Sequence, residues 1–463
     1  ANPKHADLLS MKAYALTYQT HIDEAQRLLD EVRALKPENS VAISNSLFSS
    51  LYSDSLSPQQ LSELHQSLSK QVLAAKSPTP DARPPKRSDR RLRIAYLSPD
   101  FRSHPVGFFI EPLLRHHNKD HYHVICYALP CTTDEHTQTL QSYGHDWRDL
   151  TGLNSAEIAQ QIQNDGIDIL IDLAGHTAGG RPDLIRCHLA PVQAVFIGYP
   201  FSSGIPEMDY LIADTHLVPA QYELLYSERI ARLARSFLCY QPHETTPAVA
   251  PLPALKNRHI TFGSYNNLPK VSQRCLDLWA EVLKAVPDSR MVMMASSLAD
   301  EGTREFMREN FVRRGIAAER ISLLPPVTPL SRFLAEYGRI DIALDTFPYN
   351  GGTTTCGALY MGCPVVTLEG ETFMGRMGVS LLNTLGHTEW IAQNHQLYVA
   401  IASSLASDLT KLSAIRADLR EQMLHSGLCD AEGYTQDLER LYLSWMQQDN
   451  ASEASNTLIE LSS

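Results

Sequence analysis

The chain has 463 residues, of which 43% are hydrophobic and 20% charged, and its formal net charge is −12 at pH 7. This length and mix predict a folded protein of about two to four domains. The negative charge argues against broad binding to nucleic acid or to an anionic membrane surface. The sequence contains no run of about 18 apolar residues, so no membrane span is predicted.

The eight cysteines are scattered, without a Cys-x-x-Cys pair. Such usage is typical of a reducing compartment and not of a disulfide or zinc framework. Because Ala1–His5 leads into a polar helix and not into an apolar leader, we expect a cytoplasmic location. The absence of an initiating Met indicates a processed or truncated chain.

Residues 1–75 are expected to form a short all-helical, tetratricopeptide-like segment. Apolar residues recur there at helical spacing, and Pro3 and Pro37 are separated by the roughly 34-residue period of a tetratricopeptide unit. A simple helical hairpin is the alternative. A lone repeat cannot bury its apolar faces, so the tetratricopeptide hypothesis predicts further repeats before Ala1. It also predicts protein partners that bind through these repeats.

Two proline-rich stretches, at 76–91 and 241–257, read as linkers. Short strands that are apolar on both faces alternate with helices in the regions 92–240 and 258–463, which is typical of parallel, doubly wound sheets. We therefore expect an α/β protein with two Rossmann-like domains. The last helix, 434–447, should pack back on the body. Ligands of such folds bind at the carboxyl ends of strands, which predicts a site in a cleft between the domains.

The expected strands of the first domain are 92–98, 123–129, 167–175, 193–199 and 209–214, and those of the second are 259–265, 290–296, 320–325, 340–345 and 364–368.

Polar, ionisable or turn-forming residues follow five of these strands. Each has an ordinary structural alternative: His104 can cap a turn, Asp172 can bond backbone amides, and Lys270 can be a surface residue. Their shared placement at carboxyl strand ends favours a common site. In chain order, the residues are His104; Asp172, His176 and Thr177; Gly198, Tyr199 and Pro200; Asn266, Asn267 and Lys270; and the turn at 350–355.

The stretch "DTFPYNGGTTTCGALYMGCPVVT" (345–367) places two glycines and three threonines at a helix start. Free amides of a first helical turn favour an anion by about 0.3–2 kcal/mol. The alternative is that Thr353 only caps the helix, worth about 1 kcal/mol. No Walker or dinucleotide glycine motif is present, and no Asp-x-Asp metal site is evident. These features predict the diphosphate of a nucleotide-sugar, with Lys270 neutralising it.

Residues 92–447 resemble the catalytic region of the protein O-GlcNAc transferase family, including its SPINDLY branch, whose plant member transfers fucose. The matching motifs include "LRIAYLSPDF", "HPVGFFIEPLLRHH", "DILIDLAGHT", "FGSYNNLPK" and "IALDTFPYNGGTTTCGALYMGCPVVTLEGETF". The resemblance implies a GT-B fold, two Rossmann-like domains facing across a cleft. It also implies inverting, metal-independent sugar transfer to Ser or Thr of a protein, with UDP-GlcNAc the favoured donor and no further cofactor.

The resemblance also assigns roles to single residues. Lys270, His104 and Asp172 are the expected catalytic residues, with Lys270 on the diphosphate, His104 in the sugar and acceptor pocket, and Asp172 as a proton relay. The expected donor-binding residues are Asn266, Asn267, Lys270, Thr328, Phe333, Gly352, Thr353 and Thr354, and the sugar and acceptor pocket is expected to contain His104, His176, Thr177, Gly198, Tyr199 and Pro200.

The sequence departs from this family at two positions. Gly352 stands where several sugar-transferring relatives carry His, and Gly357 where they carry an acid that holds the ribose. Phe333 stands where many relatives place an aromatic residue or His against the base. The stretches "GHTA" and "SFLCYQP" are nearer the SPINDLY branch. GDP-fucose is therefore the alternative donor, and a catalytically weak scaffold protein is the alternative class.

Overall fold

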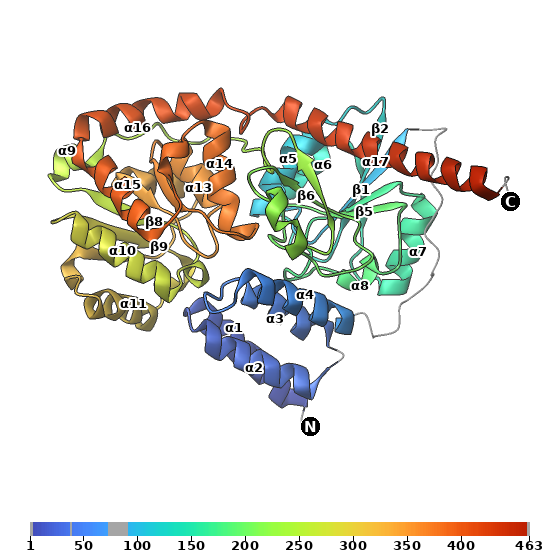
Figure 1. The fold of residues 1–463 in the computed structure, drawn as a ribbon, viewed down its shortest axis with the longest axis horizontal. Coiled ribbons are helices and arrows are strands. Elements are labelled where there is room, and N and C mark those ends of the chain that lie inside the picture. The colour runs from blue at the N-terminus through green and yellow to red at the C-terminus, as the bar shows by residue number, and fades with distance from the viewer. Residues whose placement is uncertain (1–2, 38, 73–90, 461–463) are drawn as a thin grey trace. The chain divides into compact units, whose positions relative to one another are not determined.

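The computed structural model describes residues 3–37, 39–72 and 91–460, and Figure 1 shows its fold. The expected linker at 76–91 lies outside the described residues except for Arg91. The chain divides into two compact units, neither of which is one continuous stretch of sequence. Unit 1 consists of Ala1–Leu64, His216–Leu225 and Pro242–Cys429, and unit 2 of His65–Thr215, Tyr226–Gln241 and Asp430–Ser463.

The described residues before the linker are helical, as predicted. Small apolar side chains let the helices approach closely, for example Ala6, Val32 and Ala42 in one buried cluster. The Asn39 side chain accepts a hydrogen bond from the Ala42 N–H (3.2 Å) and so starts the third helix. The tetratricopeptide assignment stays a prediction. The helices are α1 (Pro3–Tyr18), α2 (Ile22–Leu35), α3 (Ser40–Ser50) and α4 (Pro58–Val72), with α1 packed on α2 and α2 on α3.

Unit 2 contains a parallel sheet of seven strands in the order β3-β2-β1-β4-β5-β6-β7 among the described residues. The five expected strands are all present. The two edge strands, β3 and β7, were not predicted, because "DWRD" and "RIARL" carry charges that suit a half-exposed edge. The strands are β1 (Leu92–Ser98), β2 (Tyr122–Ala128), β3 (Asp146–Asp149), β4 (Ile169–Asp172), β5 (Val192–Val195), β6 (Tyr210–Asp214) and β7 (Arg229–Leu233).

The helices of unit 2 are α5 (Pro105–His116), α6 (Glu135–Ser142), α7 (Ser155–Asp165), α8 (Pro182–Ile185) and α17 (Ala431–Glu460).

Unit 1 contains a second parallel sheet, of six strands in the order β10-β9-β8-β11-β12-β13 among the described residues. Its five expected strands are also present, whereas the two-residue edge strand β13 was not predicted. The strands are β8 (Thr261–Ser264), β9 (Arg290–Met294), β10 (Ile321–Leu324), β11 (Ile342–Leu344), β12 (Val365–Leu368) and β13 (Ile391–Ala392).

The helices of unit 1 beyond the amino-terminal segment are α9 (Pro253–Asn257), α10 (Gln273–Ala285), α11 (Glu301–Arg313), α12 (Leu330–Ala335), α13 (Thr353–Tyr360), α14 (Met377–Leu385), α15 (His395–Ser407) and α16 (Leu409–Leu424).

Both sheets have the same winding. In each sheet, the first three strands follow one another from the centre to one edge, and the fourth pairs with the free side of the first. Strands β1 and β4 are therefore neighbours in unit 2, and β8 and β11 in unit 1. The loops after such a pair diverge to opposite faces of the sheet and leave room for a ligand. This winding therefore selects the loops at 99–104, 173–177, 265–270 and 345–352 as the places to look for a site.

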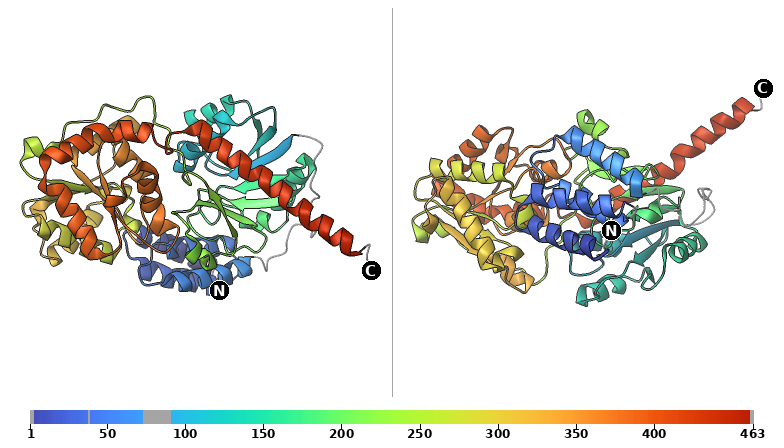
Figure 2. Two further views of the ribbon diagram at one scale, coloured as in Figure 1. Left: turned by 45° about the horizontal axis from the view of Figure 1, so that its top comes forward. Right: turned by 90° about the horizontal axis from the view of Figure 1, so that it is seen from below.

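The domain boundaries differ from the expected ones. Helix α17 belongs to unit 2, where it packs on α5 and β7. It is the red helix at the carboxyl end of the chain in Figure 2. An apolar stripe at helical spacing explains this, because Tyr434, Leu438, Tyr442 and Trp445 are all buried in the core of unit 2. The segment His216–Leu225 also leaves the expected domain and belongs to unit 1.

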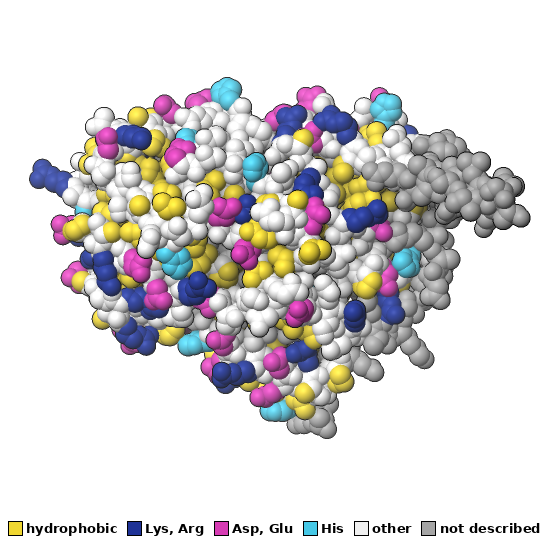
Figure 3. All heavy atoms as spheres, viewed as in Figure 1, with side chains coloured by type: hydrophobic (Ala, Val, Ile, Leu, Met, Phe, Trp, Pro, Cys, Tyr) yellow, Lys and Arg dark blue, Asp and Glu magenta, His cyan; other side chains and the backbone are white. Residues whose placement is uncertain are grey.

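No helix in the described part of the chain is both long enough and apolar enough to cross a membrane. On the face drawn in Figure 3, acidic and basic side chains are interspersed.

Substitution within α17 tests its place in the core of unit 2. We expect Leu438→Ala to lower the free energy of unfolding by about 2–5 kcal/mol, because Leu438 is fully buried. Leu443→Ala on the same helix is the control and should change it by less than about 0.5 kcal/mol, since Leu443 is 45% exposed. Urea denaturation measures both. Equal effects of the two substitutions would contradict the assignment.

Candidate active site

The start of helix α13 presents unpaired backbone donors. Gly352 precedes the helix and offers no side-chain cap. Among the described residues, no acceptor is found for the backbone N–H groups of Gly352, Thr353, Thr354 and Thr355. The alternative that Thr353 caps the helix is wrong, because Thr353 is already its first residue. Four donors at a helix N-terminus form the kind of site that binds an anion.

Gly351 lets the loop close tightly on this helix start. A Cβ at this position would lie 2.5 Å from Thr355 Oγ1 and 2.6 Å from Thr354 Oγ1, so a side chain does not fit. The Thr354 hydroxyl donates to Asn266 Oδ1 at 2.6 Å. Asn266, which is buried and follows β8, thus joins the loops at the ends of β8 and β11.

Asp345 organises the loop that leads into α13, a role that was not predicted. Its Oδ1 accepts hydrogen bonds from the N–H groups of Gly351 (2.7 Å) and Thr346 (2.9 Å), and its Oδ2 accepts one from Thr367 Oγ1 (2.8 Å). Burial raises the pKa of Asp345 to about 6, and these hydrogen bonds and Lys270 oppose the rise. The rule that picked out the other strand ends would also have found Asp345, which directly follows β11.

Lys270 brings a cation to the same loop. Its Nζ donates to the backbone oxygen of Asn350 at 2.9 Å and lies 3.9 Å from the centre of the Tyr349 ring. Burial lowers the pKa of Lys270 to about 8, and the Asp345 carboxylate opposes that shift. A partly desolvated ammonium gains from an anionic ligand more than an exposed one does.

An aromatic group lies beside α13. The rings of Tyr265, Phe333 and Tyr337 have centroids 4.7–6.0 Å apart, and Tyr337 Oη donates to the backbone oxygen of Thr354 at 2.9 Å. A Cβ at Gly357 would lie 3.4–3.5 Å from Tyr337 and Leu334, in ordinary contact. Half-buried Phe333 offers a surface for a planar base. Asn267 and Thr328 are exposed, in the loops after β8 and β10.

In unit 2, His104 caps helix α5. Its Nδ1 accepts a hydrogen bond from the Val106 N–H at 3.3 Å and lies 3.6 Å from Asp100 Oδ2. Burial lowers the pKa of His104, with Asp100 opposing and Arg102 adding to the shift, so the ring is neutral at pH 7. In that neutral ring Nε2 carries the proton and is a donor.

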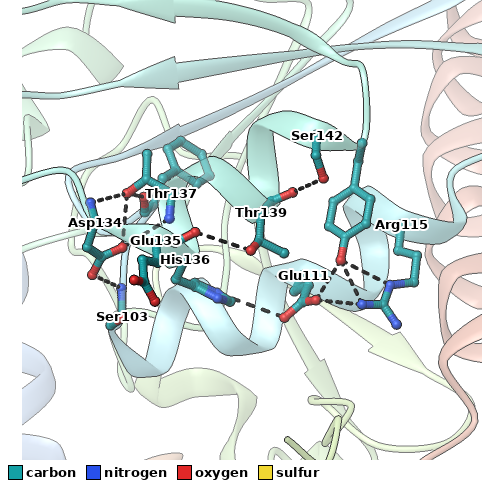
Figure 4. Close-up of polar contacts among 11 residues, drawn as sticks. Ser103, Glu111, Arg115, Asp134, Glu135, His136, Thr137, Thr139 and Ser142 are labelled. Carbon is teal, nitrogen blue, oxygen red and sulfur yellow. Dashed lines mark hydrogen bonds and ion pairs between the residues drawn. The ribbon is translucent and has the colours of Figure 1, made fainter. Parts of the chain in front are cut away.

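The start of α6 holds the loop that precedes His104 (Figure 4). Asp134 Oδ2 accepts from the Ser103 N–H at 2.8 Å, and Thr137 Oγ1 donates to the Phe101 backbone oxygen at 2.8 Å. Further along α5, Glu111 accepts from the Tyr143 hydroxyl at 2.6 Å. The first two contacts fix the backbone before His104, and the third holds the Glu111 side chain on α5.

Asp172 has the structural role that was the alternative to catalysis. Its two carboxylate oxygens accept from the N–H groups of Ala174 (2.9 Å) and Gly175 (3.0 Å), and its side chain is buried. Burial raises the pKa of Asp172 to about 6 against these hydrogen bonds. Thr177 Oγ1 closes the same turn by donating to the Ala174 oxygen at 2.8 Å. A Cβ at Gly198 would meet the Leu173 backbone oxygen at 1.8 Å, which explains the glycine.

His176 and Tyr199 lie inside unit 2 and not on its surface, since each is 1% exposed. His176 Nε2 is 2.7 Å from the Ser203 oxygen, and burial lowers the pKa of His176 to about 4. Tyr199 Oη lies 2.6 Å from Nε2 of His65, a residue of α4 that the sequence did not single out. Pro200 is also buried. Of the expected pocket residues, His104, Thr177 and Gly198 keep part of their surface accessible.

Comparison with known proteins identifies close relatives. A sequence model described as Glycosyl transferase family 41 matches residues 51–250 and 252–438. The chain is 40% identical over 360 residues to a Petunia hybrida protein named "Probable UDP-N-acetylglucosamine--peptide N-acetylglucosaminyltransferase SPINDLY", a match that covers 77% of this chain and 39% of the relative. It is 30% identical over 364 residues to the Arabidopsis thaliana protein of that activity named SEC, covering 76% and 37%.

A solved structure of a mutant Thermobaculum terrenum O-GlcNAc transferase has a TM-score of 0.90 with this chain at 34% identity, covering 97% of this chain and 86% of that one. This similarity and the two parallel sheets confirm the predicted GT-B fold class. The chain spans about two fifths of the length of the plant relatives it matches.

Alanine substitution at two glycines of one segment should affect the free energy of unfolding differently. Gly351→Ala should lower the free energy of unfolding by about 1–3 kcal/mol, because its methyl group overlaps two threonine hydroxyls. Gly357→Ala should leave it unchanged or raise it by up to about 1 kcal/mol, since its contacts are ordinary and alanine favours a helix. Thermal and urea unfolding measure both. A Gly351→Ala variant as stable as Gly357→Ala would contradict the tight closure described for this loop.

Proposed function

We propose that this chain, which belongs to glycosyl transferase family 41, transfers a sugar from a nucleotide-sugar to Ser or Thr hydroxyls of proteins. The observation that carries the proposal is the anion site formed by Lys270, which bonds to the loop before α13, and the open start of α13. Such a site suits the diphosphate of the donor. The names of the relatives favour UDP-GlcNAc as the donor.

The leaving group is the chemical centre of the proposed mechanism. As the bond between the anomeric carbon and the diphosphate oxygen breaks, negative charge grows on the diphosphate. The Lys270 ammonium and the free N–H groups of Thr353 and Thr354 are already oriented, so they stabilise this charge without reorganising. This form of charge stabilisation needs no metal ion, and we propose a metal-independent reaction.

The acceptor hydroxyl attacks the anomeric carbon from the side opposite the leaving group, so the configuration inverts. Its proton needs an acceptor. His104 is bound through Nδ1 to the Val106 N–H, which leaves Nε2 as a donor suited to hold a hydroxyl or sugar oxygen. Asp172 already accepts two backbone hydrogen bonds. We therefore assign a binding role to His104 and a structural role to Asp172, and we pass the proton, through water, to an oxygen of the leaving diphosphate.

GDP-fucose is the second candidate donor. Gly357 carries no side chain that would hold a ribose, and the stretches "GHTA" and "SFLCYQP" resemble the SPINDLY branch. Protein acceptors and partners would meet the helical segment, whose exposed apolar side chains include Leu8, Met11 and Tyr14.

A donor panel tests the proposed function. The protein is incubated with UDP- and GDP-sugars, with and without EDTA, and thermal stability and the intact mass of candidate acceptors are followed. One donor should both stabilise the protein and be consumed, equally with EDTA. Lys270→Ala should fold normally and lose at least about tenfold in rate. No consumption of any donor would favour the scaffold alternative, and a Lys270→Ala rate above about half of the original would refute the assignment of Lys270.

The affinity for UDP should depend on pH through Lys270. The pKa of Lys270 lies near 8 in the free protein, and a bound diphosphate favours the charged ammonium. The affinity should therefore fall as pH rises above 8, by up to about tenfold per pH unit, while the UDP phosphate stays ionised. Isothermal titration calorimetry between pH 7 and 9.5 measures this. Lys270→Met is the control and should bind UDP weakly at every pH; the same slope in this variant would exclude Lys270 as the titrating group.

A further inference from the structure

The turn that follows helix α3 reaches the loops around Lys270, although it is far away in sequence. The ring of Tyr52 stacks on that of Tyr349, with centroids 5.4 Å apart and planes inclined by 16°. Two residues on, Asp54 Oδ2 accepts from the Arg274 N–H at 3.3 Å, at the start of α10 and four residues after Lys270. The amino-terminal helical segment thus contacts both the loop after β11, to which Lys270 bonds, and the start of α10, which follows Lys270 in the chain.

Tyr349 connects the stacking contact to Lys270. The Lys270 ammonium lies 3.9 Å from the centre of the Tyr349 ring and bonds to the backbone oxygen of the next residue, Asn350. The backbone of Tyr349 is held as well, because its oxygen accepts from Thr346 Oγ1 at 2.7 Å. The side chain that bears the cation therefore depends on its ring neighbours for its position.

Tyr52 is well placed to fix that ring. Tyr52 and Tyr349 are 9% and 8% exposed, so the stacked pair excludes water. Phe48, one helical turn before Tyr52, packs edge-on against it with centroids 5.5 Å apart. The family match begins at residue 51, so this turn lies inside the region shared with the transferases.

We propose that Tyr52 is a positioning residue for Lys270, acting through the Tyr349 ring, so that the helical segment is part of the donor-binding apparatus. The role in catalysis rests on the proposed function, whereas the effect on the lysine does not. Tyr52 itself touches neither donor nor acceptor in this proposal. Without its ring, water reaches Tyr349 and Lys270, and the ammonium is no longer held in one place.

The test compares Tyr52→Ala and Tyr52→Phe with Leu29→Ala, a buried residue of α2 in a separate cluster. The first readout is independent of catalysis: Lys270 is acetylated by acetic anhydride across a pH series and followed by mass spectrometry. Since burial is the main cause that lowers the pKa of Lys270, Tyr52→Ala should move the midpoint upward by about one pH unit. Tyr52→Phe and Leu29→Ala should leave it in place.

The second readout is UDP affinity and transfer. Tyr52→Ala should weaken UDP binding at pH 7 by about fivefold or more. It should also lower kcat, with little change in the KM for the acceptor. Tyr52→Phe should keep the UDP affinity and the kcat of the wild-type protein. Leu29→Ala should lower thermal stability with UDP affinity unchanged. If Tyr52→Ala does not fold, Tyr52→Val replaces it, because valine keeps part of the apolar contact and still leaves space for water beside Tyr349.

An unmoved acetylation midpoint in Tyr52→Ala, or in the valine variant, would overturn the proposal. So would equal losses of UDP affinity in Tyr52→Ala and Leu29→Ala, because that result would mean general destabilisation. Failure of the wild-type protein to bind UDP or consume a donor would refute the proposed function alone. The acetylation midpoint would still decide whether Tyr52 positions Lys270.

Discussion

The buried carboxylate of Asp345 is the interaction on which the candidate donor site depends. It directly follows strand β11 and accepts two backbone hydrogen bonds from the loop there, one of them from Gly351. Those bonds fix the loop that leads into α13, whose first N–H groups are unpaired. Unit 2 uses the same device at the equivalent place in its sheet, where Asp172 ends β4 and binds the N–H groups of Ala174 and Gly175.

Asp345 and Lys270 are buried near each other, and this burial determines the pKa values of both groups. Desolvation raises the pKa of Asp345 and lowers that of Lys270, and each charge partly offsets the shift of the other. Taking both groups out of water is costly. An anionic ligand beside Lys270 would recover the part of this cost that comes from burying the ammonium.

The helical segment and the α/β sheets are also less separate than their sequences indicate. Tyr52 belongs to the helical segment and packs on Tyr349 in the loop after β11, while His65 of α4 pairs with Tyr199 in the core of unit 2. In both places an aromatic side chain on a loop at a carboxyl strand end contacts a residue of the amino-terminal helical segment, Tyr52 in the turn after α3 and His65 in α4. Neither contact would be required if the helical segment served only to bind protein partners.

Local sequence patterns determined the elements of this protein. Apolar runs marked ten of the strands, and the rule for carboxyl strand ends singled out Lys270 and the glycine–threonine turn, because both depend on residues close together in the chain. The tertiary structure decided what required distant partners. It placed α17 in unit 2, buried His176 and Tyr199 and brought Tyr52 against Tyr349. These contacts join residues that are far apart in the chain, so no local pattern predicts them. Asp172 and Asp345, by contrast, bind N–H groups of their own loops at strand ends, which a reading of the sequence can reach.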